Sequence, residues 1–170
     1  VERFEIAFAR ELGVKHCIAT PGCNPALSAL AAAFSFAPGD EIIVSPITDY
    51  GTIQGLVREN YIPVFADAAP GTVNLSAATI EPCITDRTRA ILCVHKTGLT
   101  CDMDPIMDIA HKYNAIVIED ACQAHGAEYL SAGARRWRRA GSVGISAAFS
   151  FYPGKNLGAC GEAGAVTTDN

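Results

Sequence analysis

A pair of adjacent carboxylates follows a fully apolar stretch of the sequence. The segment from Ile118 to His125 begins as an apolar strand and reaches Glu119 and Asp120. In an open α/β sheet, ligands bind at the carboxyl ends of the strands, and a carboxylate held there away from bulk water suits a protonated ring nitrogen or a metal ion. The alternative for Asp120 is a helix cap for the residues that follow.

A lysine follows a second strand-like stretch. The segment from Phe149 to Asn156 runs from a strand into a turn that ends in Lys155. A lysine held near other groups at a strand end can lose its proton and attack a carbonyl group, although most loop lysines are only solvated. The segment is not a nucleotide-binding P-loop, because Phe149 stands where that motif needs its first glycine.

The third segment, from Thr20 to Leu27, combines a strand end, a turn at Gly22 and the start of a helix. The first N–H groups of a helix have no partner within it and can bind an anion, although an ordinary strand-to-helix connection has the same pattern. An anion site, a buried carboxylate and a nearby amine suit the phosphate, ring nitrogen and aldehyde of pyridoxal 5′-phosphate (PLP). The three segments therefore predict a PLP site.

Short runs rich in Ile and Val alternate with segments of helical periodicity, which predicts an α/β fold with a mainly parallel sheet flanked by helices. The expected helices, each opened by a turn or cap residue, cover residues 25–34, 52–60, 76–84 and 104–113. The expected strands cover residues 17–20, 41–45, 63–66, 90–95, 115–119, 146–151 and 163–167. Strands at these positions would bring the carboxylate and the lysine to strand ends.

Length and composition indicate one domain with a sizeable core, since the chain has 170 residues and is 49% hydrophobic. Its net charge of −5 is spread over many short segments, so neither nucleic acid nor an anionic membrane is an expected partner. The seven cysteines include no Cys-x-x-Cys pair and no zinc-ligand spacing, which predicts no metal site and unpaired thiols in a reducing compartment. Without a signal-peptide pattern or a membrane-spanning apolar run, we expect a cytoplasmic protein.

Eight segments match a known family in order and spacing: residues 11–16, 38–43, 63–67, 84–91, 94–95, 118–121, 123–127 and 149–157. Through them the sequence resembles, essentially from end to end, the DegT/DnrJ/EryC1/StrS sugar aminotransferases of the aspartate aminotransferase (fold type I) superfamily. The resemblance implies a homodimer with active sites at its interface. It also implies transfer of an amino group from an amino acid, usually glutamate, to a keto sugar linked to a nucleotide.

The resemblance also implies roles for individual residues. Lys155 is expected to form the internal aldimine with PLP, and Asp120 to pair with the pyridine nitrogen and keep it protonated. These two are the predicted catalytic residues, and Lys155 would also shuttle the substrate's α-proton. Gln123 is expected beside the ring hydroxyl, and Ser150 is expected to bind the phosphate.

Two segments depart from the family pattern. Where the family usually has Ser-Gly-Thr at the phosphate-binding helix start, this chain has Gly22, Cys23 and Asn24, which keep the backbone donors and replace the threonine hydroxyl with an amide. Asp49 stands where an aromatic side chain commonly stacks on the cofactor ring, which a carboxylate cannot do. Either Tyr50 turns inward or the cofactor is held differently. Positions 22, 23, 24 and 49 stay among the expected cofactor-binding positions.

A basic run and two histidines have open roles. The segment from Ala134 to Arg139, where the family has a shorter variable loop, holds four arginines around Trp137. It either grips a nucleotide diphosphate or forms a solvated loop. His95 and His125 match family positions, and each is either a structural or a catalytic residue.

We expect residues 1–170 to form the PLP-binding large domain of a longer chain, without the C-terminal small domain that helps to close the site in the family. One alternative is a PLP-dependent synthase or dehydratase of the same family, although the known sugar dehydratases have histidine in place of the lysine at position 155. The other is a non-catalytic regulatory or sensory homologue, which Cys23, Asn24 and Asp49 favour.

Overall fold

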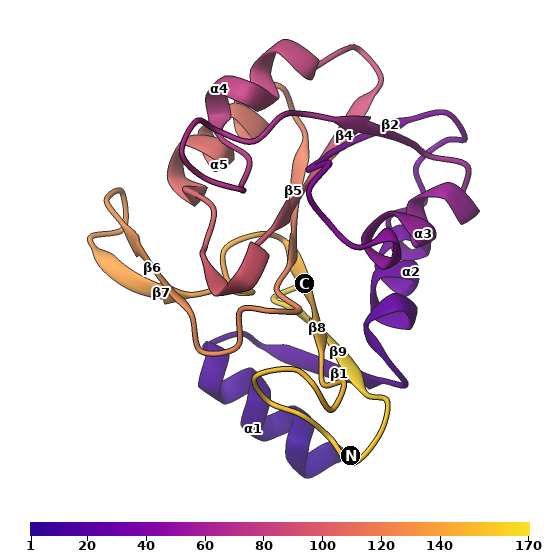
Figure 1. The fold of residues 1–170 in the computed structure, drawn as a ribbon, viewed down its shortest axis with the longest axis vertical. Helices are drawn as coiled ribbons and strands as arrows, with labels where there is room; N and C mark the ends of the chain where they lie inside the picture. The colour runs from indigo at the N-terminus through magenta and orange to yellow at the C-terminus, as the bar shows by residue number, and fades with distance from the viewer.

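Apolar strands and amphipathic helices alternate along the chain and assemble into one seven-stranded sheet with helices on both faces (Figure 1). The computed structural model describes all residues from 1 to 170. The order across the sheet is β1-β9-β8-β5-β4-β2-β3. These strands are β1 (His16–Thr20), β2 (Glu41–Val44), β3 (Ile62–Phe65), β4 (Thr88–Val94), β5 (Ile116–Asp120), β8 (Ser146–Ser150) and β9 (Gly164–Thr168).

The sheet is mainly parallel, as the sequence predicts. Strands β3, β2, β4, β5 and β8 pair in parallel, whereas β9 runs antiparallel to both of its neighbours, β8 and β1. Strand β1 therefore points the same way as β8. As a result, the carboxyl ends of every strand except β9 lie at one edge of the sheet, which is where open α/β sheets bind ligands.

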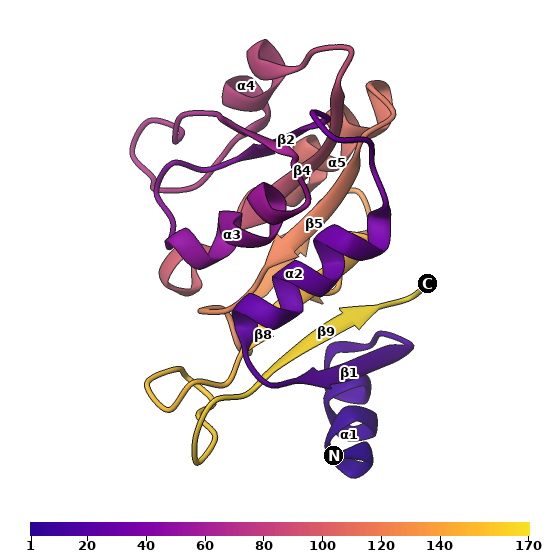
Figure 2. The same ribbon diagram turned by 90° about the vertical axis from the view of Figure 1, so that its right-hand side faces the viewer.

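Successive strand residues face opposite sides of the sheet, and each side has its own helices. Ile42 and Ile118 pack beneath α2 (Cys23–Phe34) and α3 (Tyr50–Arg58), the layer seen in front of the sheet in Figure 2. Ile43 and Val117 pack against α4 (Ala77–Ile80) and α5 (Met103–Lys112) on the other side. The remaining helix, α1 (Glu2–Leu12), packs on β1, β8 and β9 around the buried Phe149.

Every expected strand is present, and its ends shift by two residues at most. The expected helix over residues 76–84 is shorter: α4 gives way to the 3-10 helix η1 (Glu81–Cys83). Pro82 lacks the N–H that would continue an α-helix. Ser76 begins α4 as expected, because its hydroxyl accepts a hydrogen bond from the Thr79 N–H. A second 3-10 turn, η2 (Lys96–Gly98), follows β4.

The arginine-rich segment forms a hairpin that the sequence analysis did not predict. Strands β6 (Glu128–Ser131) and β7 (Arg136–Arg139) pair antiparallel and project from the body of the molecule (Figure 1). Arg139 pairs in register with Glu128 and forms ion pairs with both Glu128 and Glu11. Residues 136–139 of the segment therefore form a regular strand, whereas Ala134 and Arg135 lie in the turn of the hairpin.

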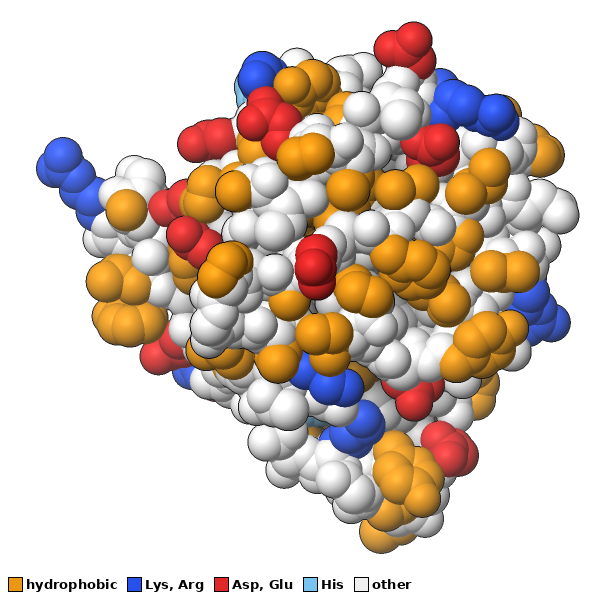
Figure 3. All heavy atoms as spheres, turned by 45° about the horizontal axis from the view of Figure 1, so that its top comes forward, with side chains coloured by type: hydrophobic (Ala, Val, Ile, Leu, Met, Phe, Trp, Pro, Cys, Tyr) orange, Lys and Arg blue, Asp and Glu red, His pale blue; other side chains and the backbone are white.

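Charged groups of both signs are dispersed over the face shown in Figure 3, with no broad field of one sign. This distribution agrees with the charge pattern of the sequence. None of the helices is long and apolar enough to span a membrane.

Candidate active site

The strand ends and the segments that follow them enclose a cavity of about 500 Å³. All eight positions that the sequence analysis singled out line it: Gly22, Cys23, Asn24, Asp49, Asp120, Gln123, Ser150 and Lys155. They come from the last residues of β5 and β8 and from the segments that follow β1, β2, β5 and β8. The structure therefore brings the predicted residues together, and their individual roles remain predictions. None of the arginines of the hairpin lines the cavity.

Asp120 is the last residue of β5 and is only 5% exposed. Its Oδ2 accepts a hydrogen bond from the Thr52 hydroxyl at 2.7 Å, and its Oδ1 accepts one from the Cys122 N–H at 3.1 Å. Burial raises the pKa of Asp120 above its ordinary value, although these hydrogen bonds and the nearby charge of Lys155 oppose the shift. Asp120 caps no helix. It is a buried carboxylate that faces a cavity and suits a cationic ligand.

Thr52 is a site residue that the sequence analysis missed. It is buried in the first turns of α3, its hydroxyl lies 2.7 Å from that of Thr48, and both side chains line the cavity. Since the Thr52 hydroxyl donates to Asp120, it accepts from Thr48. Because 68 residues separate Thr52 from Asp120, no local sequence motif links them. The one available signal was a hydroxyl on the inward face of an amphipathic helix.

The start of α2 forms another part of the cavity lining. The helix begins at Cys23 with Gly22 as its N-cap, so the Cys23 and Asn24 N–H groups lack intrahelical partners and are available to an anion. Gly164, the first residue of β9, lies directly against this turn. A Cβ atom at Gly164 would stand 2.5 Å from the carbonyl group of Gly22, so only glycine allows this close approach.

The other predicted residues sit on short connections that other contacts hold in place. Ser150 ends β8 and is buried, and the Lys155 N–H donates to the Tyr152 carbonyl in the turn that follows. Gln123 accepts a hydrogen bond from the Thr97 N–H at 2.8 Å through its Oε1. That bond fixes the orientation of the Gln123 amide and leaves its NH₂ group free to donate.

Asp49 has a structural explanation that does not involve ring stacking. It is the N-cap of α3, and its Oδ1 accepts a hydrogen bond from the Gly51 N–H at 2.8 Å. Tyr50 is 65% exposed and does not line the cavity. Of the two possibilities that the sequence left open, an inward-turned Tyr50 is therefore absent from this structure.

The two histidines differ in their surroundings. His95 lines the cavity, and its buried ring is bonded on both sides: its Nδ1 accepts from the Cys101 N–H at 3.2 Å and its Nε2 lies 2.8 Å from a Glu119 oxygen. The ring of His125 packs against Phe149 and Phe151, has no hydrogen-bond partner and lies outside the cavity lining. Burial lowers the pKa of His125, which suits a neutral packing residue.

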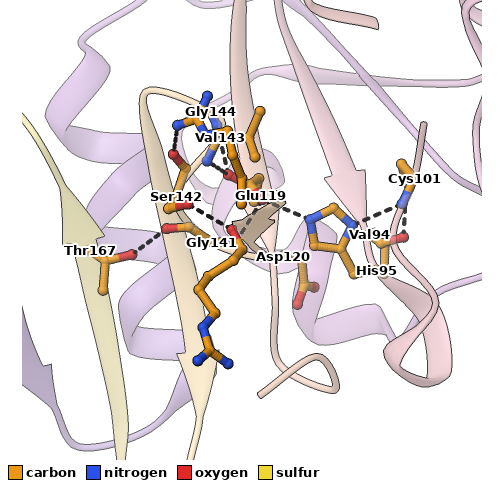
Figure 4. Close-up of polar contacts among 12 residues, drawn as sticks. Val94, His95, Cys101, Glu119, Asp120, Gly141, Ser142, Val143, Gly144 and Thr167 are labelled. Carbon is orange, nitrogen blue, oxygen red and sulfur yellow. Dashed lines mark hydrogen bonds and ion pairs between the residues drawn. The ribbon is translucent and has the colours of Figure 1, made fainter. Parts of the chain in front are cut away.

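Glu119 holds together the segments behind the cavity (Figure 4). The side chain is fully buried, and its Oε2 accepts a hydrogen bond from the Gly141 N–H at 2.7 Å in addition to its contact with His95. Its Oε1 accepts from the N–H groups of Val143 at 2.7 Å and Gly144 at 2.6 Å. Burial alone raises the pKa of Glu119, but its bonds to His95 and to the backbone outweigh that effect and lower it below its ordinary value. Sequence analysis gave Glu119 no separate role.

The structure corrects the expectation that all the thiols are unpaired. Cys23 and Cys122 form a disulfide that joins the start of α2 to the turn after β5, and both line the cavity. The two cysteines are 99 residues apart in the sequence, so their spacing carries no signal of pairing. The other five cysteines are free.

Comparisons with known proteins agree with this architecture. The model of the DegT/DnrJ/EryC1/StrS aminotransferase family matches residues 1–170. A dTDP-3-amino-3,6-dideoxy-alpha-D-galactopyranose transaminase from Aneurinibacillus thermoaerophilus is 44% identical over 170 residues, which are 100% of this chain and 45% of the relative. The chain spans less than half the length of the curated relatives it matches.

Solved structures give the same result. An aminotransferase from Psychrobacter cryohalolentis superposes with a TM-score of 0.93 at 40% identity, covering 99% of this chain and 41% of its own. NtdA from Bacillus subtilis, solved with bound cofactor PMP, superposes with a TM-score of 0.89 at 34% identity, covering 99% of this chain and 37% of its own. The protein belongs to the DegT/DnrJ/EryC1/StrS aminotransferase family.

Proposed function

We propose that this protein is a PLP-dependent aminotransferase that moves an amino group from glutamate to a keto sugar linked to a nucleotide. The observation that carries the proposal is the convergence of a buried carboxylate, a lysine and a free helix start on one cavity. Membership of the family and the nucleotide-sugar transaminase among its relatives support the reaction class and the sugar acceptor. Glutamate is the donor that the family resemblance implies.

The residues of the cavity fit PLP in their chemistry. PLP has a phosphate, a pyridine nitrogen that binds a proton, and an aldehyde. The N-terminus of α2 offers backbone donors for the phosphate, Asp120 offers a buried carboxylate for the protonated nitrogen, and Lys155 offers an amine for the aldehyde. A volume of about 500 Å³ also lies within the usual range for a small-molecule site.

When bound, PLP supplies a ring that accepts electrons as the substrate's α-proton leaves. The role of Asp120 is to hold a proton on the ring nitrogen, and the hydrogen bonds from Thr52 and Cys122 favour the ionised carboxylate that this requires. Lys155 carries the α-proton at its Nζ. Ser150 and the start of α2 bind the phosphate. Gln123, whose carbonyl is already engaged by Thr97, donates its NH₂ group to the ring hydroxyl.

The proposal includes the organisation of the whole protein. Residues 1–170 form the PLP-binding large domain of a longer chain, whose remaining part helps to bind the sugar. Two such chains form a homodimer that acts in the cytoplasm on small-molecule substrates. The relatives, which are more than twice as long as this chain, support the longer chain.

Borohydride trapping tests the cofactor site. The purified full-length protein is incubated with PLP, reduced with borohydride and digested, and the modified peptide is identified by mass spectrometry. We expect one pyridoxyl group on Lys155 and none in Lys155→Ala. Lys96 also lines the cavity, so Lys96→Ala is a matched control that should retain the adduct on Lys155. An adduct on Lys96, or none in the parent, refutes the assignment.

Transfer of ¹⁵N from labelled glutamate to a nucleotide-linked keto sugar tests the reaction itself. We expect labelled amino sugar from the parent and none from Lys155→Ala. A trapped adduct without turnover on any donor would favour the regulatory alternative. Turnover without nitrogen transfer would favour a synthase or a dehydratase.

A further inference from the structure

The Cys23–Cys122 disulfide lies inside the proposed cofactor site. Cys23 is the first residue of α2, and Cys122 follows Asp120 by two residues in the turn after β5. Their Cα atoms are 6.9 Å apart, and both side chains line the cavity. The cross-link therefore joins the helix start proposed to bind the phosphate to the turn that carries the carboxylate proposed for the ring.

The two sulfur atoms crowd the carboxylate that the ring nitrogen needs. The Sγ atoms of Cys23 and Cys122 and a carboxylate oxygen of Asp120 all lie within 4.8 Å of one another. A protonated ring nitrogen bonded to that carboxylate would stand about 2.8 Å from its oxygen, with the rest of the ring extending into the same cavity. The disulfide and a cofactor ring bonded to Asp120 would therefore share the part of the cavity next to this carboxylate.

The disulfide also acts on the anion end of the site. The N–H of Cys23 is one of the free donors at the start of α2, so a covalent bond through its side chain fixes this residue relative to β5. Reduction releases that tie and leaves two thiols that can move apart to admit a ligand. The state of one bond thus affects both the proposed phosphate site and the proposed ring site.

The remaining cysteines make this pair distinctive within the chain. Cys17, Cys93 and Cys101 are buried and free, whereas Cys160 is exposed and free. Of the seven, only Cys23 and Cys122 line the cavity, so reagents in the cavity reach them when it is empty. A ligand that fills the cavity blocks that access.

We propose that Cys23 and Cys122 form a reversible dithiol–disulfide site that competes with the cofactor, the dithiol form binding PLP and the disulfide form weakening that binding. This inference rests on the proposed PLP site. Oxidised glutathione serves as the oxidant. One cysteine thiolate attacks the S–S bond of glutathione, forms a mixed disulfide and releases one glutathione thiolate. The second cysteine thiolate attacks the protein sulfur of the mixed disulfide and releases the other glutathione.

The reaction balances as two protein thiols and one glutathione disulfide giving one protein disulfide and two glutathione thiols. The two protein sulfurs are oxidised, and the two glutathione sulfurs are reduced. Excess dithiothreitol runs the protein half of the reaction in reverse. Because binding linkage is reciprocal, PLP at 100 times its dissociation constant for the dithiol form shifts the thiol–disulfide equilibrium toward the dithiol, about 9-fold if the disulfide form binds 10-fold more weakly and about 100-fold if the disulfide form does not bind.

Two measurements test the site, and one of them does not depend on activity. The full-length protein is prepared with dithiothreitol or with oxidised glutathione, and the Cys23–Cys122 link is quantified by mass spectrometry of non-reduced peptides. PLP binding by each form is then titrated by absorbance. We expect the oxidised form to bind PLP at least 10-fold more weakly, and dithiothreitol to restore binding. Saturating PLP should slow formation of the link at least 10-fold.

Matched variants separate this pair from other thiols. In the double variants Cys23→Ser/Cys122→Ser and Cys23→Ala/Cys122→Ala, oxidised glutathione should leave PLP affinity the same as in the reduced variant, because neither the intramolecular link nor a mixed disulfide can form in the cavity. Cys160→Ser removes an exposed thiol outside the cavity and should keep the full redox response. Two double variants are used so that the conclusion holds if one of them fails to fold.

The outcomes distinguish this inference from the function on which it rests. Equal PLP binding by the two forms, with the link demonstrated, overturns the redox site and leaves the aminotransferase proposal standing. A response to oxidant that persists in both double variants also overturns it. Absence of PLP binding by either form overturns the cofactor assignment and the redox site together.

Discussion

Replacement of Glu119 by glutamine should destabilise the protein strongly, because one buried carboxylate satisfies four donors. The Oε2 atom contacts the His95 ring and the Gly141 N–H, and Oε1 accepts from Val143 and Gly144. A glutamine amide has the same shape but only one acceptor oxygen. In either orientation its NH₂ group faces two donors, and His95 cannot become an acceptor at Nε2 without giving up its bond from the Cys101 N–H.

The magnitude follows from the two donors left without a partner. Hydrogen bonds to charged groups contribute about 1.5–3 kcal/mol each, and an unsatisfied buried donor costs about 1–3 kcal/mol. We expect Glu119→Gln to lower the free energy of unfolding by roughly 3 kcal/mol, out of a total of about 5–15 kcal/mol for a typical protein. That loss corresponds to a fall of roughly 6–12 °C in the midpoint of thermal unfolding.

Urea unfolding followed by circular dichroism measures this change directly. Glu81→Gln is the matched control, since Glu81 also accepts from two side chains, Lys112 and Tyr113, but lies at the surface. Its unfolding midpoint should stay close to that of the parent, because exposed ion pairs contribute little. The account of Glu119 is refuted if Glu119→Gln and Glu81→Gln have the same midpoint.

The same variant has a predicted pH dependence. The bonds at Glu119 hold its pKa in the folded protein below the ordinary value of 4.5. A lowered carboxyl pKa stabilises the folded state above the unfolded value, and that contribution is lost as the pH falls through the folded pKa. The stability difference between the parent and Glu119→Gln should therefore narrow as the pH falls below 4.5. A difference in unfolding free energy that grows as the pH falls would contradict the lowered pKa of Glu119.

Two further substitutions test the cavity. Thr52→Val keeps the shape of the side chain but removes its hydrogen bond to Asp120, which should raise the pKa of that carboxyl further and weaken PLP binding about 10-fold in an absorbance titration. Gly164→Ala would place a Cβ atom 2.5 Å from the Gly22 carbonyl group and should weaken PLP binding and lower the unfolding midpoint. Gly133→Ala, whose Cβ would approach nothing closer than 3.8 Å, should change neither.

The location of the cavity could be predicted from the sequence because each predicted residue follows an apolar strand. Asp120 ends β5 and Ser150 ends β8, and parallel pairing brings such positions to one edge of the sheet. Parallel pairing also brings Asp49, after β2, to that edge. Gly22, after β1, reaches it because β1 and β8 both run antiparallel to β9 and so point the same way. The lining thus follows from strand identity and direction alone, without the order of strands across the sheet.

The contacts within the cavity could not be predicted in the same way. Thr52 meets Asp120, and Cys23 meets Cys122, across 68 and 99 residues respectively. These pairs depend on how α2 and α3 lie over the sheet. Side-chain packing determines that arrangement, and no local sequence pattern predicts it. The β6–β7 hairpin is different, since Glu128 faces Arg139 across it. This pairing of opposite charges could have been predicted from the sequence by matching each arginine with an acidic residue instead of considering the arginines as one group.

Glu119 and Asp120 show why adjacent residues of similar chemistry have different fates in this fold. Neighbouring residues of a strand face opposite sides of the sheet, so one carboxylate must point away from the other. Asp120 opens into the cavity, where burial raises its pKa and a cationic ligand would lower it again. Glu119 meets only protein donors, which already lower its pKa and leave it no capacity for a ligand. Because the two side chains face opposite sides of the sheet, binding of a cationic ligand should shift the pKa of Asp120 and leave the pKa of Glu119 unchanged.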